Sequence, residues 1–261
     1  MNIHLTWATT LRVLTQLRRD RRTLALIGGI PIILLTLLWW MFRDWSPIPP
    51  IPGLPADAIP VQQNPFDSVG PAIMGLFPLI IMFLITSVTT LRERQGGTME
   101  RLMASPAARA DIVFGYAIAF GLFAALQGGI VVCYSIWVLG LDFAGPVWAL
   151  LVIIVLDAVL GSCLGLAASS LARTEFQALQ MMPLVILPQL LLSGIAIARD
   201  EMPEVLHWIS STLPLSYAID AIHELTSNTD ATVILNEVAI LLAFIIGALI
   251  LGTATLRRRT D

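Results

Sequence analysis

Long apolar runs alternate along the chain with short polar segments. Six runs with at most one charged side chain lie at 24–42, 71–91, 112–139, 148–171, 177–197 and 233–256. A helix needs about 20 such residues to cross a hydrocarbon core about 30 Å thick. Hydrophobic residues make up 57% of the 261-residue chain, against roughly 45–50% in soluble domains. The pattern therefore predicts an all-α polytopic membrane protein, with six transmembrane helices in one domain of residues 24–256.

The arginines give this predicted bundle an orientation. The chain contains no lysine, and thirteen of its fifteen arginines fall on one side of the six spans. Only Arg43 and Arg199 fall on the other side. By the positive-inside rule the arginine-rich side is cytoplasmic. We therefore expect a multi-pass protein of the cell membrane, plasma or inner, with both termini in the cytoplasm, including a basic tail at 257–261.

Residues 1–23 have a pattern of their own. Apolar side chains recur at helical spacing, and the arginines lie mostly elsewhere on the helical wheel; the apolar positions are Ile3, Trp7, Leu11, Leu14 and Leu17. This predicts an amphipathic interfacial helix on the cytoplasmic membrane surface. A cleaved signal peptide is the competing interpretation, but no small-residue cleavage site follows Trp39 and Trp40.

The polar segment RERQGGTMERLMASP, residues 92–106, separates the second and third spans. Gly96 and Gly97 can end the membrane helix, Thr98 can cap a new one, and Pro106 discourages its continuation. The new helix would present Met99, Leu102 and Met103 on one face and leave Glu100 and Arg101 for polar contacts. So short a helix needs packing to persist. A charged loop docked on its own protein remains an equal alternative.

The segment after the fifth span predicts two amphipathic helical pieces on the outer side, at 203–211 and 215–225, broken by Pro214. Trp208 and Tyr217 suit the level of the lipid headgroups. Re-entrant pieces and an ordinary outer loop are the two interpretations of this pattern.

Polar residues inside the spans are the remaining candidates. Asp157 lies near the middle of the fourth span, where a charged, unpaired carboxylate costs several kcal/mol. It is therefore either a structural carboxyl within the bundle or a substrate or proton site. Gln180 and Gln189 can line a cavity or join helices, and Gly161 and Gly165 favour close helix packing. Cysteines and histidines form no cluster at metal-ligand spacing, so we expect no metal site.

Two stretches resemble a known family. RERQGGTMERLMASPAARADIVFGY is similar to the cytoplasmic loop of type-2 ATP-binding-cassette (ABC) exporter permeases, and SGIAIARDEMPEVLHWISSTLPLSYAIDAI is similar to their segment between the fifth and sixth spans. The six-span layout extends the resemblance over nearly the whole chain, with the drug and lipid exporter branch as the nearest type.

The resemblance implies two functional segments. The first is a coupling helix near 98–104 that docks on an ATPase, with contacts from Arg94, Thr98, Met99, Glu100, Arg101, Leu102, Met103, Ser105 and Pro106. The second is a re-entrant segment in the outer leaflet that includes Pro203, Trp208, Pro214, Leu215, Tyr217 and Asp220.

The function implied is that of a permease subunit, without catalytic residues or cofactor of its own, that exports an amphipathic drug, lipid or glycolipid. ATP and Mg²⁺ would bind a separate cytoplasmic ATPase, because a P-loop needs a lysine and this chain has none. A second permease subunit, identical or different, and membrane lipids are the other expected partners; nucleic acid is not. The alternative is a proton-coupled secondary transporter that uses Asp157. A membrane-embedded enzyme is a weaker alternative, because no nucleophile or acid-base cluster is present.

Overall fold

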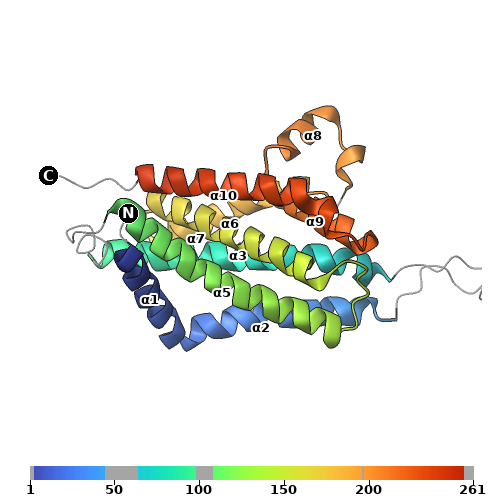
Figure 1. Ribbon diagram of the computed structural model, residues 1–261, viewed down its shortest axis with the longest axis horizontal. Helices are drawn as coiled ribbons and strands as arrows, with labels where there is room; N and C mark the ends of the chain where they lie inside the picture. Colours follow the sequence, from blue (N-terminus) through green and yellow to red (C-terminus); the bar gives the residue numbers. More distant parts are fainter. Residues whose placement is uncertain (1–2, 45–63, 98–107, 196, 256–261) are drawn as a thin grey trace, which may run out of the picture.

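The computed structural model describes residues 3–44, 64–97, 108–195 and 197–255, which form helices and connecting turns without a strand. Six of these helices are long and apolar enough to cross a membrane, and Figure 1 shows them side by side. They are α2 (Arg21–Phe42), α3 (Pro65–Gln95), α5 (Arg109–Trp137), α6 (Val147–Leu171), α7 (Glu175–Leu192) and α10 (Leu235–Thr255). The predicted class of all-α polytopic membrane protein is therefore confirmed.

Most predicted span boundaries agree with the helices, with exceptions at α3 and α7. The 31-residue α3 extends the predicted span 71–91 in both directions. Asn64 caps its start by accepting a 3.0 Å hydrogen bond from the Phe66 N–H. At the other end, helix continues through the polar residues 92–95. The last turn of α3 therefore carries charged side chains beyond its apolar part.

The predicted fifth span, 177–197, was too long, because α7 ends at Leu192. Gly194 turns the chain there with a φ of +93°, in the left-handed region that favours glycine. The Leu192 carbonyl accepts hydrogen bonds from the hydroxyls of Ser210 at 2.7 Å and Ser216 at 3.3 Å. These bonds satisfy a helix-end carbonyl that a longer helix would have used internally.

The centre of the bundle is the pair α3 and α6. A Cβ atom at Gly161 would overlap the Leu79 carbonyl oxygen, and one at Gly165 would overlap that of Phe83. The two backbones are therefore in direct contact, and the expectation that these glycines pack within the bundle is confirmed. In their apolar spans 61% of the residues of α3 and of α6 are buried, against only 17% in α2, α7 and α10.

The helix α1 (Ile3–Arg19) lies across one end of the bundle, as Figure 1 shows. We call this the arginine-rich end. It also carries the last turn of α3 and the junction between α6 and α7. The predicted N-terminal helix is thus present, although it ends at Arg19 and α2 begins already at Arg21. Its location at a membrane surface stays a prediction.

Short helices cover the other end, which we call the outer end. They are a 3₁₀ turn (Arg199–Glu201), α8 (Glu204–Ser210), α9 (Pro214–Ser227) and a second 3₁₀ turn (Ala231–Ile234). The two predicted pieces correspond to α8 and α9, with Pro214 in the first turn of α9. Ile222 of α9 fills the space beside Gly75, where a Cβ would lie 2.8 Å from its Cδ1 atom. Gly75 lies inside the second candidate span, which favours the re-entrant interpretation.

Candidate functional site

The last turn of α3 holds the arginine-rich end together. Four consecutive side chains, Arg92 to Gln95, each bond a different part of the chain, and we call them the end clamp. Arg92 donates to both carboxylate oxygens of Glu175 in α7, at 2.8 and 2.9 Å. Arg94 donates to the Ser169 carbonyl in α6. The Gln95 amide donates to the carbonyl of Arg173, between α6 and α7, at 2.8 Å.

Glu93 makes the fourth bond of the end clamp, and it is the most buried one. Its carboxylate accepts a 3.0 Å hydrogen bond from Arg12 of α1. The Glu93 side chain is only 4% exposed. Arg12 also donates to the Tyr116 hydroxyl of α5 at 2.7 Å and lies 5.8 Å from the centre of that ring. One buried ionic contact therefore joins α1, α3 and α5.

The chain directly after the end clamp contains the predicted coupling segment. Gly96 closes α3, with its N–H donating to the Arg92 carbonyl at 2.9 Å, and Gly97 turns the chain with a φ of +70°. On the far side, the Ala108 N–H donates to Asp111 of α5 at 3.0 Å. Both ends of the segment are thus anchored. The predicted contact residues themselves, 98–103 with Ser105 and Pro106, lie outside the described residues.

Arg94 is the one predicted ATPase contact that the structure describes. Its guanidinium bonds the Ser169 carbonyl of its own chain, so it positions the end of α3 against α6. A contact of Arg94 with an ATPase stays a prediction.

A second polar cluster ties the outer end together, centred on Arg199. Arg199 forms an ion pair with Asp220, donates to the Ser211 hydroxyl at 3.1 Å and lies 5.2 Å from the ring centre of Tyr217. The Tyr217 hydroxyl in turn donates to the Ser211 carbonyl at 2.7 Å. Burial raises the pKa of Asp220 above its ordinary value of 3.8, although the charge of Arg199 lowers it.

The other predicted outer residues differ in burial. Pro214 and Leu215 are buried at the start of α9, and Pro203 precedes α8. Trp208 is 70% exposed on α8, which projects from the bundle in Figure 1. The structure therefore brings Tyr217 and Asp220 into one cluster and leaves Trp208 outside it.

The three polar residues predicted inside the membrane have different environments. Asp157 is fully buried, and neither carboxylate oxygen has a hydrogen-bond partner among the described residues. Gln189 is also buried; its amide oxygen accepts from the Leu215 N–H at 3.4 Å, which links α7 to the first turn of α9. Gln180 is exposed on α7. Gln189 thus joins α7 to α9. For Asp157, by contrast, no contact among the described residues accounts for the burial of its carboxyl.

Sequence reasoning did not identify Arg12, Glu93, Glu175 or Arg199 as site residues. The sequence does contain a sign of the role of Glu93 and Glu175, because acidic residues are few on the side of the spans that carries thirteen arginines. A carboxylate in such surroundings is expected to pair. Which arginine it pairs with depends on the fold.

Comparisons with known proteins give the family. The family model described as "ABC-2 type transporter" matches residues 4–225. A probable multidrug ABC transporter permease of Escherichia coli K12, YbhR, is 29% identical over 152 residues, which are 58% of this chain and 41% of that protein. The linearmycin resistance permease protein LnrN of Bacillus subtilis is 29% identical over 157 residues, or 60% of this chain and 40% of that one. The chain thus spans about two fifths of these relatives. Because the family model covers most of its length, the chain belongs to the ABC-2 type transporter family.

Proposed function

We propose that this chain is the permease subunit of an ATP-driven exporter of the cell membrane, with its arginine-rich end in the cytoplasm. A separate ATPase would bind ATP and Mg²⁺ and dock on residues 98–104. The supporting observation is the end clamp. It lies directly before the docking segment and bonds α1, α6 and α7 through consecutive side chains.

This arrangement lets a small displacement act on several helices at once. A force on residues 98–104 pulls on the last turn of α3, and the clamp passes it most directly to α1, through the buried Arg12–Glu93 pair, and to α6, through Arg94. Two contacts can transmit this force without rearranging: the buried Arg12–Glu93 pair and the backbone contact at Gly161 and Gly165. Packed interiors transmit strain because they contain few voids.

The proposed cargo is an amphipathic drug, lipid or glycolipid. Two bacterial relatives are named for multidrug transport and for linearmycin resistance. The apolar surface of the described residues suits such a cargo, but it suits contact with membrane lipid equally well. The proposed class of cargo therefore rests on the resemblance.

A second permease subunit, identical or different, would complete the pathway. Gln180 supports this part of the proposal, because it is exposed on α7 within a candidate span. An amide that faces hydrocarbon without a partner is costly. A neighbouring subunit or an aqueous pathway would satisfy it.

The test is affinity purification of the tagged chain from its native host in mild detergent, with identification of bound proteins and an ATPase assay. We expect an ABC ATPase that is lost from Arg101→Glu and from Leu102→Asp. Arg43→Glu is the control, because it makes the same charge change at the outer end. Recovery of the folded chain without an ATPase, or with one that both variants retain, would contradict the proposal.

The second candidate is a proton-coupled transporter, and the environment of Asp157 favours it. A fully buried carboxyl whose two oxygens have no hydrogen-bond partner in the described part of the chain is a suitable proton carrier. Transport by reconstituted protein with a proton gradient but no ATPase would support this candidate. If Asp157→Asn transported normally over a broad pH range, the proton role would lose its main support.

A further inference from the structure

The helix α1 presents three different faces. One face docks on the protein: Thr10 donates to the Gly115 carbonyl of α5 at 3.1 Å, and a Cβ at Gly115 would lie 2.7 Å from that of Thr9. This close contact fixes the rotation of α1. A second face is apolar and exposed, with Ile3 at 73%, Trp7 at 54% and Leu11 at 47%. An exposed apolar stripe at helical spacing fits the interfacial region of a bilayer.

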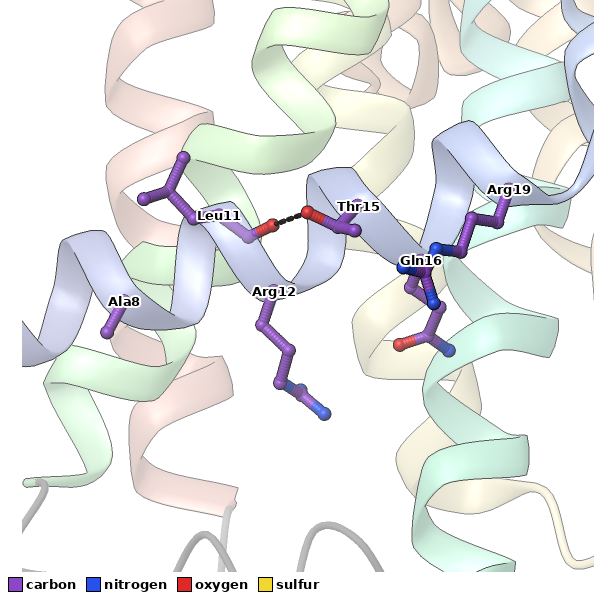
Figure 2. A pocket seen from close by; sticks show the side chains of 6 residues that line it. All are labelled: Ala8, Leu11, Arg12, Thr15, Gln16 and Arg19. Atoms are coloured by element: carbon purple, nitrogen blue, oxygen red, sulfur yellow. Dashed lines mark hydrogen bonds between the residues drawn. The ribbon is translucent and has the colours of Figure 1, made fainter.

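The third face of α1 borders an open hollow of about 610 Å³. It is lined by Ala8, Leu11, Arg12, Thr15, Gln16 and Arg19. Figure 2 shows Arg12 and Gln16 pointing to the same side of α1, with Arg19 beside Gln16. Leu11 belongs both to the hollow and to the exposed apolar stripe. The hollow therefore borders the exposed apolar stripe, which is the surface predicted to face lipid.

Positive charge is concentrated where α1 meets α2. Arg18, Arg19 and Arg21 are exposed, and within the described ranges none of them forms an ion pair. Arg22 follows in the sequence. The acid between them, Asp20, is engaged in capping α2: its carboxylate accepts from the Thr23 N–H at 3.2 Å and from the Thr23 hydroxyl at 2.7 Å. The sequence thus places four arginines and one acid at positions 18–22, directly before a span.

We propose that this junction binds the phosphate of an anionic phospholipid, with Arg18, Arg19 and Arg21 as the cationic groups and Gln16 as a hydrogen-bond donor. Basic clusters next to a span attract anionic headgroups, and each arginine strengthens binding about fivefold, equivalent to about 1 kcal/mol. The acyl chains would lie along Leu11 and Trp7. The inference depends on membrane insertion of α2 and does not require an ATPase.

The test is native mass spectrometry of the detergent-purified full chain, titrated with dioleoylphosphatidylglycerol or dioleoylphosphatidylcholine. The first bound phosphatidylglycerol is expected to have a lower Kd than the first phosphatidylcholine. The double variant Arg18→Gln/Arg19→Gln should weaken phosphatidylglycerol binding by about 25-fold and leave phosphatidylcholine unchanged. Both arginines are exposed, so the melting temperature in detergent should match that of the unsubstituted chain.

The matched control is Arg257→Gln/Arg258→Gln, which removes the same charge from the basic tail. We expect it to change the Kd less than twofold. Three results would overturn the proposal: equal affinity for the two lipids, an equal loss in the tail variant, or displacement of phosphatidylglycerol by inorganic phosphate at equal concentration. The last would identify a site for free anions instead of a lipid site.

Discussion

The Arg12–Glu93 contact is expected to be the strongest ionic interaction of the arginine-rich end. Its atoms lie 3.0 Å apart, and at an effective dielectric constant of about 20 two unit charges at that separation attract by about 5 to 6 kcal/mol. Desolvation of the nearly buried Glu93 cancels most of this gain. Arg12 stays 30% exposed and keeps part of its hydration. A net coupling of about 1 to 2 kcal/mol remains.

A double-mutant cycle with Arg12→Gln and Glu93→Gln measures this coupling, with unfolding in mixed micelles followed by circular dichroism. The chain offers a matched control in Arg92–Glu175, whose side chains are 60% and 43% exposed. An exposed pair of this kind contributes about 0.2 to 1 kcal/mol and is screened by salt. We expect the Arg12–Glu93 coupling to exceed the control and to change little with salt. Equal couplings, or equal loss in high salt, would refute the reasoning.

Three further results are expected in the same unfolding assay. Gly161→Leu and Gly165→Leu should each destabilise the bundle by about 1 to 3 kcal/mol or more through overpacking, whereas Gly29→Leu, with open space beside it, should have little effect. Asp157→Leu should stabilise the chain by about 1 to 3 kcal/mol by removing a buried carboxyl that has no hydrogen-bond partner among the residues the structure describes; a loss of stability would show that the carboxyl has a partner. Because the pKa of Asp220 is raised in the fold, its contribution to stability is present below pH 3.8 and is lost as pH rises through the raised pKa. Asp220→Asn should flatten that part of the stability profile, and an unchanged slope would contradict the assignment.

The membrane layout could be predicted from sequence because it depends on local properties. An apolar run long enough to cross the bilayer must be helical to satisfy its backbone, and the six runs therefore correspond to the six candidate spans. The length of α3 was underestimated because the prediction used only this local hydropathy. Residues 92–95 continue the helix through contacts with other helices, and hydropathy contains no information about those contacts.

The end clamp depends on pairings across long stretches of sequence. Arg12 and Glu93 are 81 positions apart, and Arg92 and Glu175 are 83 apart. The sequence shows which charges are scarce, but the register of α1 on α5 decides which of them meet. That register depends on the space beside Gly115, where Thr9 packs. A single glycine in an apolar run gives no sign of such a contact.

The unequal burial of the spans indicates how the bundle can move. The helices α3 and α6 touch backbone to backbone and are mostly buried, so they should move as one body with α1, which the Arg12–Glu93 pair holds. Only 17% of the apolar span of α7 is buried, and at the end clamp its hydrogen-bonded contact with α3 within the described residues is the exposed Arg92–Glu175 pair, beside a small buried cluster of Leu91, Ala172 and Ala178. Exposed pairs contribute little free energy, so the ionic part of this link can open at low cost, and the apolar cluster that opposes opening contains only one leucine and two alanines. At the outer end, α7 is instead held through Gln189 and the Leu192 carbonyl. A force on the arginine-rich end should therefore tilt α7 about its outer end, which separates it from α3 and α6 first at the arginine-rich side.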